Sequence, residues 1–573
     1  MRDRFLIFTT SLLFLLIVIG LFYNQIVMYG YYAKLSRNNS IRVIPIEGPR
    51  GDIFDRTGRL LVTNRLSFDA AMVYQEIGDR RKLMDLLRDT LGLSGTQIMD
   101  AFEKSGKRAY GPVTIAEDIP KEKALALEEA GFDVSGIAIE TRSKRDYIYK
   151  HFGSHIFGYL SEITDNELEK LKDYGYRMRD LIGRAGLEKY YEDALRGTDG
   201  GTQIEVDNRG HQRRVLGLKE PESGQDLYLT IDLSLQVACD KLLGEHKGAI
   251  VAMDPRNGDV LALASHPSFD PNIFVRRGTS EERLRLLNDR KGRPMSNKAI
   301  SGLYPPGSVF KIVTASAALE QKKITRYTKF FCPGSYKFGR TQFDCWKEGG
   351  HGPQDVVEGI KNSCNVFFYN TGRVLGVDRL ESYAKLFGYG KPTGIDLPDE
   401  VGGIAPGRDW KRSHKKGIWY EGETINYSIG QGYLSVTPIQ VLEMVSIMAN
   451  NGNLVRPRLV RRVGSNDLPN QKPKSIGLKE ETIRNVRAGL FEAVNSESGT
   501  AKRAKLEGAI VAGKTGTAQN PQGRTHAWFC GFAPYGDPKI CLVVFLEHGG
   551  KGGLEPAEIA RGVFAEAKNL GYL

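Results

Sequence analysis

The 573-residue sequence has few cysteines and no dense run of basic residues with interleaved aromatic residues. Six cysteines are too few for a disulfide-stabilised scaffold of this length. The 80 Lys and Arg residues exceed the 68 Asp and Glu residues by 12, but the surplus is spread along the chain. A nucleic-acid-binding protein is therefore not favoured. No glycine-rich, phosphate-binding loop is present, so the sequence does not suggest a nucleotide-driven activity.

Long apolar runs are equally scarce, and the only one is N-terminal. Residues 5–22 carry no charge, and a weakly polar continuation to residue 28 brings the segment to about 20 residues or more, the length that spans a membrane. A cleaved signal peptide would have a shorter run and a small-residue cleavage site, which this segment lacks. Arg2 and Arg4 precede the run and favour a cytoplasmic N-terminus. We expect a cytoplasmic tail (1–4), a single-pass anchor (5–28) and a chain that continues across the membrane.

The remainder of the chain divides in two by its residue pattern. Residues 29–224 are charged, with short strand-like and helical pieces. They include a helical stripe that we assign to packing, formed by Leu187, Tyr190, Tyr191 and Leu195. This part contains no recognisable pair of nucleophile and base, and we expect a spacer or docking domain. Residues 225–573 alternate between apolar strands and helices, and we expect the chemistry there.

Strand patterns occur at both ends of residues 225–573, and helical patterns occur between them. Residues 249–253 and 260–264 flank an Asn-Gly turn and predict a hairpin. Further strands are expected at 508–512, 526–533 and 540–546, before a C-terminal helix over 556–569. The two ends must meet in one sheet with helices on its faces, which predicts an α+β fold with an antiparallel sheet.

Three short motifs carry candidate chemistry. The first is Ser308-Val309-Phe310-Lys311, at the start of a predicted helix, where the i, i+3 spacing places Ser308 and Lys311 on one face. A lysine with a lowered pKa can remove the proton of a serine nucleophile. Taken alone, this pattern occurs often by chance and is more typical of a helix cap beside a solvated lysine. The other motifs are Ser363-Cys364-Asn365 and Lys514-Thr515-Gly516-Thr517, and the order of all three strengthens the interpretation.

With these three motifs in this order, the chain resembles the penicillin-binding proteins and class A β-lactamases. It is most similar to class B penicillin-binding proteins, the single-pass peptidoglycan transpeptidases. Further matching stretches are Arg50-Gly51-Asp52-Ile53-Phe54-Asp55-Arg56, Gly186-Leu187-Glu188, Leu229-Thr230-Ile231-Asp232, Asn426-Tyr427-Ser428-Ile429-Gly430-Gln431-Gly432, Thr437-Pro438-Ile439-Gln440 and Trp528-Phe529-Cys530-Gly531-Phe532-Ala533-Pro534. Within the class, Cys345-Trp346 followed by Gly350-His351-Gly352 resembles the elongation-type enzymes.

The resemblance implies an elongated pedestal, or dimerisation, domain (29–224) followed by a transpeptidase domain (225–573). It also implies the catalytic roles. Ser308 attacks the penultimate D-alanine of a stem peptide, and Lys311 is the general base. Ser363 relays a proton to the leaving amine with help from Lys514. The like charge of Lys514 would lower the pKa of Lys311, and burial would act in the same direction.

The resemblance assigns substrate binding to the second and third motifs. Asn365 would bind the peptide amide, and Thr515 and Thr517 would hold the terminal carboxylate on either side of Gly516. The backbone N–H groups of Ser308 and Thr517 would form the oxyanion hole. No cofactor is required for the acyl transfer, and β-lactam antibiotics would acylate the same serine.

A metal site is a second implication. Cys332, Cys345, His351 and Cys364 lie within 33 residues, and zinc favours a tetrahedral set of Cys and His ligands. Their spacing is not that of a common zinc finger. The resemblance supports zinc because some elongation-type relatives carry one beside the active site. A Cys332–Cys345 disulfide, or unpaired thiols, remain as alternatives.

Two classes of function follow from the sequence. The first is a D,D-transpeptidase that cross-links peptidoglycan during elongation, with the division-type enzyme as the nearest alternative. The second is a non-catalytic β-lactam sensor or scaffold on the same fold. A hydrolytic β-lactamase is less consistent with the anchor and pedestal. The resemblance implies as partners the lipid-linked glycan strand, a polytopic glycan polymerase and a periplasmic elongation scaffold.

Overall fold

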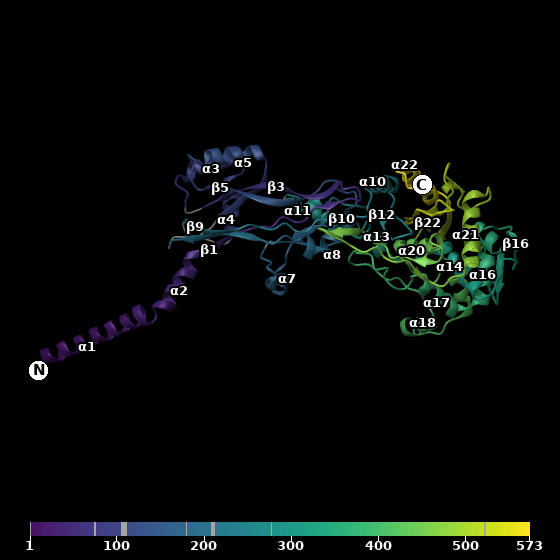
Figure 1. Ribbon diagram of the computed structural model, residues 1–573, viewed down its shortest axis with the longest axis horizontal. Coiled ribbons are helices and arrows are strands. Elements are labelled where there is room, and N and C mark those ends of the chain that lie inside the picture. The colour runs from purple at the N-terminus through teal and green to yellow at the C-terminus, as the bar shows by residue number, and fades with distance from the viewer. Residues whose placement is uncertain are drawn as a thin grey trace. The chain divides into compact units, whose positions relative to one another are not determined.

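The computed structural model describes residues 2–73, 76–104, 112–178, 180–207, 212–276, 278–520 and 523–573, and Figure 1 labels its elements. Met1, the first residue of the expected tail, lies outside them. The chain forms two compact units. The first consists of Met1–Gly51, Asn64–Lys144 and Arg196–Gly224, and the second of Asp52–Thr63, Arg145–Leu195 and Gln225–Leu573.

The N-terminal apolar run is helical. Helix α1 (Arg2–Phe22) continues through a π-helical turn, η1 (Tyr23–Val27), and α2 (Tyr29–Ser40) follows. The stretch Arg2–Val27 is long and apolar enough, by length and composition, to cross a membrane. At 1.5 Å per residue its 26 residues extend about 39 Å, beyond the hydrocarbon thickness of about 30 Å. None of the residues of α1 is buried, as expected for a helix that is apolar on all sides.

Among its described residues, the rest of the first unit contains two groups of paired strands and three helices. Strands β1 (Ile41–Ile46), β8 (Gly200–Val206) and β9 (Gln212–Lys219) form one sheet, and β3 (Leu60–Met72) pairs with β4 (Val113–Ile119) and β5 (Ile137–Tyr147). The helices are α3 (Arg80–Leu91), α4 (Gly95–Lys104) and α5 (Lys121–Ala130). Leu83 and Leu87 of α3 and Leu127 of α5 are buried in one small core. This core is separate from that of the second unit.

A five-stranded antiparallel sheet organises the second unit. Its order is β12-β11-β23-β22-β21, with bounds Val260–His266, Gly248–Met253, Ile540–Leu546, His526–Ala533 and Ala512–Ala518. Strands from both ends of the unit meet at the β11–β23 pair, where Gly248 lies opposite Leu546. The expected hairpin and the expected strands 526–533 and 540–546 are therefore confirmed.

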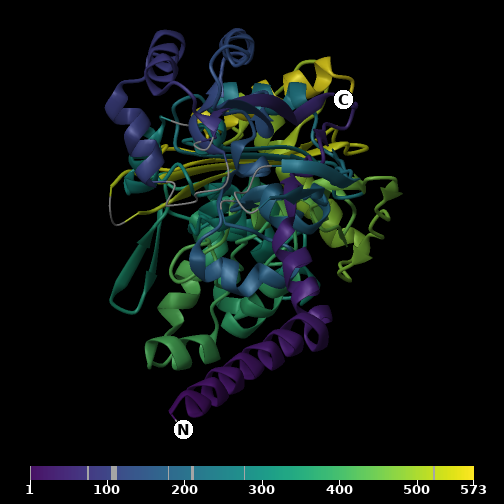
Figure 2. The same cartoon turned by 90° about the vertical axis from the view of Figure 1, so that its left-hand side faces the viewer.

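Successive side chains along these strands point to opposite faces of the sheet, so the sheet has one hydrophobic core on each face. On β11, Ala249 and Val251 face one core and Ile250 faces the other. The first core contains α14 (Lys311–Glu320) and the fully buried α20 (Pro438–Ala449). The second contains α10 (Leu233–Leu243) and α22 (Glu555–Asn569). Figure 2 shows the yellow C-terminal strands between these helical layers. The α+β fold with helices on both faces of an antiparallel sheet is confirmed.

Two local expectations differ from the structure. The strand expected at 508–512 begins only at Ala512 and runs through the third motif to Ala518, because Gly508 is in a turn with a left-handed φ of +76°. The helical stripe expected near 186–195 is broken into α8 (Gly186–Tyr190) and α9 (Glu192–Leu195). Leu187 and Leu195 are buried, but Tyr190 is 50% exposed. The prediction of a continuous packing stripe is therefore wrong for Tyr190.

Candidate active site

Ser308 lies in a single 3-10 turn, η4 (Gly307–Phe310), that leads into α14. Gly307 has a φ of +56°, and a Cβ added there would lie 2.7 Å from the carbonyl oxygen of Thr517. Only glycine therefore fits this close approach to β21. Val309 and Phe310 are buried, whereas Ser308 is half-buried. The turn presents the Ser308 hydroxyl at the surface of a rigid support.

Lys311 is the first residue of α14 and is fully buried. Its Nζ donates to the Ser363 carbonyl oxygen at 2.8 Å, the Ser363 hydroxyl at 3.3 Å and Asn365 Oδ1 at 2.7 Å. Burial lowers the pKa of Lys311 to about 8. The first and second motifs, which are 52 residues apart, are thus joined through one amine with an unusually large neutral fraction.

Ser363 and Asn365 are held by local geometry as well as by Lys311. Ser363 follows α15 (Val356–Lys361) with a φ of +50°, a left-handed conformation that a non-glycine residue adopts only at some cost. Its side chain is buried. Asn365 begins α16 (Asn365–Leu375), and its Nδ2 donates to the Asp344 carbonyl oxygen at 3.2 Å. Both side chains therefore have defined positions beside Lys311.

The third motif lies on β21, the edge strand of the sheet. Lys514 is fully buried, and its Nζ donates to the Thr515 carbonyl oxygen at 2.9 Å. A Cβ on Gly516 would lie 3.0 Å from both the Pro306 carbonyl oxygen and Val309 Cγ1. The missing side chain lets the strand pack directly against the turn of Ser308. Thr515 is buried and Thr517 is exposed at the strand edge.

Burial lowers the pKa of Lys311, as expected from the sequence, but the charge coupling between the two lysines acts on the pKa of Lys514 and not on that of Lys311. Burial and then the charge of Lys311 keep the pKa of Lys514 well below its usual value. The lowered pKa of Lys311 is instead due to burial, and neighbouring thiols act in the opposite direction. The expectation that Lys514 would lower the pKa of Lys311 is therefore not supported. The expected convergence of the two amines is present.

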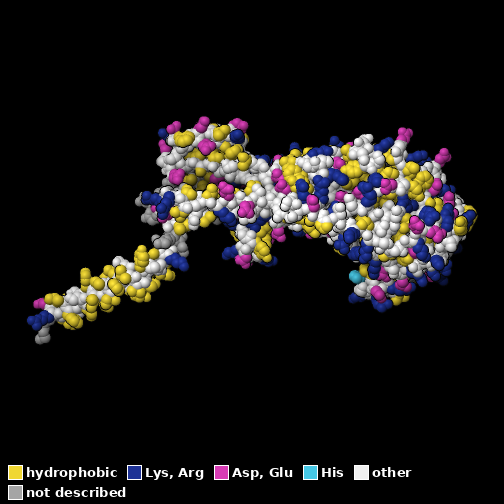
Figure 3. Space-filling view, in the orientation of Figure 1, with side chains coloured by type: hydrophobic (Ala, Val, Ile, Leu, Met, Phe, Trp, Pro, Cys, Tyr) yellow, Lys and Arg dark blue, Asp and Glu magenta, His cyan; other side chains and the backbone are white. Residues whose placement is uncertain are grey.

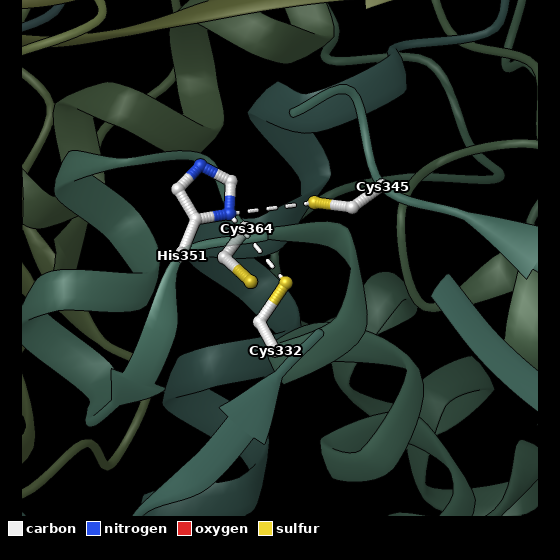
Figure 4. A group of neighbouring side chains, drawn as sticks. All are labelled: Cys332, Cys345, His351 and Cys364. Atoms are coloured by element: carbon white, nitrogen blue, oxygen red, sulfur yellow. Dashed lines mark hydrogen bonds between the residues drawn. The ribbon is translucent and has the colours of Figure 1, made fainter. Parts of the chain in front are cut away.

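The four candidate metal ligands converge beside the second motif (Figure 4). Cys332 ends β13 (Phe330–Cys332), Cys345 follows β15 (Thr341–Asp344), His351 precedes β16 (Gly352–Gln354) and Cys364 caps α16. Their ligand atoms all lie within 4.8 Å of one another. The Sγ atoms of Cys332 and Cys345 lie 3.6 and 3.5 Å from His351 Nδ1.

This cluster has the donor types that zinc prefers, and the spacing of its two Cys–His pairs fits a tetrahedral ion. Ligand atoms 2.0–2.3 Å from a tetrahedral zinc are about 3.3–3.8 Å apart, and the two Cys–His distances lie in that range. All six cysteines have free thiols, so the alternative Cys332–Cys345 disulfide is not formed. Hydrogen bonds with Cys364 and then with His351 lower the pKa of Cys345, whereas the hydrogen bond with Cys345 and then burial raise the pKa of Cys364, so this pair favours one thiolate.

The structure defines the surroundings of two further residues near the site. His526 is buried on β22, its Nδ1 accepts from the His548 N–H at 3.2 Å, and its ring packs against Tyr304. It is therefore a packed strand histidine. Gly430 was quoted only as part of a family motif, yet its carbonyl accepts from the Gly307 N–H at 2.9 Å. The two glycines in Gly430-Gln431-Gly432 are the feature of the sequence that could have predicted this close approach of two backbone segments.

Comparison with known proteins gives two family matches. The family described as penicillin binding protein transpeptidase domain matches residues 248–565, and the family described as penicillin-binding protein dimerisation domain matches residues 45–229. A curated relative, the peptidoglycan D,D-transpeptidase MrdA of Haemophilus influenzae, is 35% identical over 568 residues, which cover 94% of this chain and 87% of the relative.

Solved structures agree over nearly the whole chain. A penicillin-binding protein (PBP2) of Helicobacter pylori, solved in complex with MreC, has a TM-score of 0.82 and 28% identity over 93% of this chain and 99% of that chain. A chain from a structure entitled "Structural coordination of polymerization and crosslinking by a peptidoglycan synthase complex" has a TM-score of 0.74 and 32% identity. It matches over 99% of this chain and 98% of that chain.

Proposed function

Because the chain belongs to the penicillin-binding protein transpeptidase family, we propose that it is a peptidoglycan D,D-transpeptidase of the elongation type. One observation carries the proposal: buried Lys311 reaches Ser363 and Asn365, while β21 packs against the turn of Ser308. A nucleophile, a base and a second amine from distant segments thereby occupy one site. The division-type role and the non-catalytic sensor remain the alternatives, and the names of the relatives favour elongation.

The proposed acylation begins with Lys311 in its neutral form. As an ammonium group, Lys311 uses its three N–H bonds for Ser363 and Asn365. As a neutral amine it keeps two of them and has a lone pair that can accept the proton of Ser308, on the same helical face. The Ser308 oxygen then attacks the carbonyl carbon of the penultimate D-alanine, and a tetrahedral oxyanion forms.

The oxyanion is proposed to accept hydrogen bonds from the backbone N–H groups of Ser308 and Thr517. Support comes from the packing of Gly307 against Thr517, which places the two backbone segments in contact. Ser363 would pass a proton to the departing amine of the terminal D-alanine, assisted by Lys514. The amine of a second stem peptide then attacks the acyl-enzyme, which releases Ser308 and leaves a new peptide cross-link.

Substrate binding is proposed along the edge of β21. As the last strand of its sheet, β21 leaves one row of backbone groups free for an extended peptide within the described residues. Thr515 and Thr517 would hold the terminal carboxylate with Lys514. Gly516 keeps the strand close to Ser308, and Asn365 would bind the peptide amide. A β-lactam occupies the same position and acylates Ser308.

A direct test uses the purified protein and a labelled penicillin. We expect one covalent adduct per chain, and peptide mapping by mass spectrometry should place it on the peptide that contains Ser308. A synthetic peptide ending in D-Ala-D-Ala should release D-alanine and compete with labelling. An unlabelled chain, or an adduct on a different peptide, would overturn the proposed function.

The proposal includes one structural zinc ion bound by Cys332, Cys345, His351 and Cys364. Four protein ligands leave no open position, so the ion would supply rigidity and no catalytic water. Because Cys364 lies between Ser363 and Asn365, the ion would fix the strained second motif against Lys311. The acyl transfer itself would use only the side chains and backbone groups described above.

Metal analysis of the purified protein is expected to find about one zinc per chain. Cys345→Ser should lose most of the zinc, lower the melting temperature and slow penicillin labelling. Cys239→Ala is the matched control, because Cys239 is buried in α10, away from the cluster. Metal-free protein with full stability and full labelling would contradict the zinc site.

We place the protein in the inner membrane, with Arg2 and Arg4 on the cytoplasmic side and the catalytic unit on the other. The apolar stretch Arg2–Val27 supports a single-pass anchor. The titles of the related structures support two partners, an MreC-like periplasmic scaffold and a glycan polymerase. The domain limits proposed from the sequence are retained: anchor 5–28, pedestal 29–224 and transpeptidase 225–573.

A further inference from the structure

Helix α18 (Arg408–Lys415) and the loop after it carry a high density of positive charge. Residues 408–416 include five Lys or Arg residues and one Asp, and aromatic residues occur at positions 410, 419 and 420. The expectation that the sequence lacks a basic run with interleaved aromatic residues is therefore wrong here. Acidic segments elsewhere offset the charge of this run in the composition of the whole chain. The run becomes noticeable only when the fold shows it as one exposed helix and loop.

One lysine of this segment is structural. Lys411 is buried, and its Nζ lies 2.6 and 2.7 Å from the two carboxylate oxygens of Glu423. The same Nζ lies over the rings of Tyr420 and Tyr433, at 4.8 and 5.9 Å from their centroids. These contacts attach α18 to α19 (Glu421–Tyr427) and leave the other charges of the helix facing solvent.

The remaining cations are exposed and weakly paired. Arg412 lies 3.7 Å from Asp409, but the two side chains are 79% and 93% exposed, so this pair contributes little. Lys415 and Lys416 are exposed and form no ion pair within the described part of the chain. In Figure 3, dark blue side chains gather where Figure 1 places α18. We define the basic-aromatic surface as Trp410, Arg412, His414, Lys415 and Lys416.

The aromatic part of this surface is ordered by stacking. The rings of Trp410 and His414 lie 5.3 Å apart at an interplanar angle of 12°. Trp410 also contacts Tyr433, with ring centroids 5.3 Å apart. Trp410 is half-buried, and a large ring fixed in this way has little conformational entropy left to lose on binding.

The basic-aromatic surface is connected to the candidate active site through residues 430–433. Tyr433, which packs against Trp410, follows Gly430 by three residues, and the Gly430 carbonyl accepts from Gly307, the neighbour of Ser308. Lys415 Nζ lies 6.0 Å from the centroid of the Tyr433 ring. One short chain segment, residues 430–433, therefore joins the turn of Ser308 to the ring that packs against this surface.

We propose that the basic-aromatic surface binds the peptidoglycan polymer beyond the reacting peptide ends, an inference that rests on the proposed function. Stem peptides carry free carboxylates that repeat along the strand, and exposed lysines attract them. The flat faces of sugar rings present C–H groups that pack on an aromatic ring such as Trp410. Each contact is weak, but a polymer that makes several at once is held by their combined effect.

The test measures binding of the full-length protein in detergent to purified insoluble peptidoglycan by co-sedimentation. The Lys415→Glu/Lys416→Glu variant should bind about tenfold more weakly, because each reversal removes an attraction and adds a repulsion. Its labelling by fluorescent penicillin should be unchanged. The matched control is Lys502→Glu/Lys505→Glu, which makes the same charge change at exposed lysines beside α22 and should bind like the parent protein.

Measurements at high salt and with lipid vesicles distinguish peptidoglycan binding from binding to lipid headgroups. Binding of the parent protein should fall as salt is raised from physiological strength to 1 M, where the Debye length drops from about 8 to about 3 Å. Unchanged peptidoglycan binding by Lys415→Glu/Lys416→Glu would overturn the proposal. The proposal would also be overturned if this variant lost binding to vesicles that contain anionic phosphatidylglycerol but still bound peptidoglycan. That result would assign the surface to lipid headgroups. Absence of penicillin labelling in the parent protein would overturn the proposed function, and the inference with it.

Discussion

Replacement of Ser308 by alanine is expected to abolish covalent labelling by penicillin and to lower peptide cross-linking by a factor on the order of 10⁴ or more. The hydroxyl oxygen is the proposed nucleophile, and no other side chain occupies its position in the turn. The fold should be unaffected, because Ser308 is half-buried and the turn is held by Gly307, Val309 and Phe310. Fluorescence of the labelled band measures acylation, and a thermal melt checks the fold.

Ser316→Ala is the matched control for this variant. Ser316 lies on the same helix, α14, and its hydroxyl donates only to the carbonyl of Ile312, one turn earlier. Its removal should leave labelling close to that of the parent protein. Labelling of Ser308→Ala at the parental rate would reassign the nucleophile and end the proposed mechanism.

Replacement of Lys311 by methionine is expected to slow acylation by about 10²–10⁴-fold, the contribution typical of a general base. The side chains are similar in length, so the buried space stays filled. Removal of the Lys311 charge relieves a burial penalty of roughly 3 kcal/mol. It also leaves the Ser363 carbonyl and the Asn365 amide without this hydrogen-bond donor, which costs about 2–6 kcal/mol of stability. The two effects largely offset each other. A folded but slow variant is the expected result. Lys323→Met, at an exposed position just after α14, is the control.

The pH profile of acylation should identify the same amine. With the pKa of Lys311 at about 8, about a tenth of the side chain is neutral at pH 7, against about one part in three thousand for an ordinary lysine. The neutral form is the base, so the rate should rise about tenfold per pH unit below pH 8 and level off above it. The Lys311→Met variant should lose this rise. A parent profile that is flat between pH 6 and 8 would contradict the role of Lys311.

Much of the catalytic unit could be predicted from residue patterns because its strands are strongly apolar and bounded by clear turns. The hairpin around Asn257-Gly258 and strands β22 and β23 are examples. Prediction failed where a local pattern had two readings. Gly508 ends a turn, so apolar residues 509–511 do not form a strand with it. Near Tyr191 the helix breaks, since the pattern alone does not contain the packing partners that decide which residues are buried.

The candidate site shows the same division. The residue types and their order were sufficient to name Ser308, Lys311, Ser363 and Lys514, because this set of motifs has a chemical interpretation and a family resemblance. The lowering of the Lys311 pKa by burial was expected, but the segments that bury the amine were not predictable. Whether Lys311 has a lowered pKa depends on its burial by segments far away in the chain, and the same is true of Lys514.

The sequence by itself determined the apolar anchor segment, the alternating strands and the presence of a hydroxyl, two amines and four zinc-type ligands. Local interactions within a few residues suffice for these features. Only the tertiary structure decided that β11 pairs with β23, that the thiols and the imidazole lie within 4.8 Å, and that a basic helix packs on Tyr433, close in the chain to the residue that binds the nucleophile's turn. The reason is that such contacts join segments tens to hundreds of residues apart, and they form only when burial of both cores compensates the entropy of bringing those segments together.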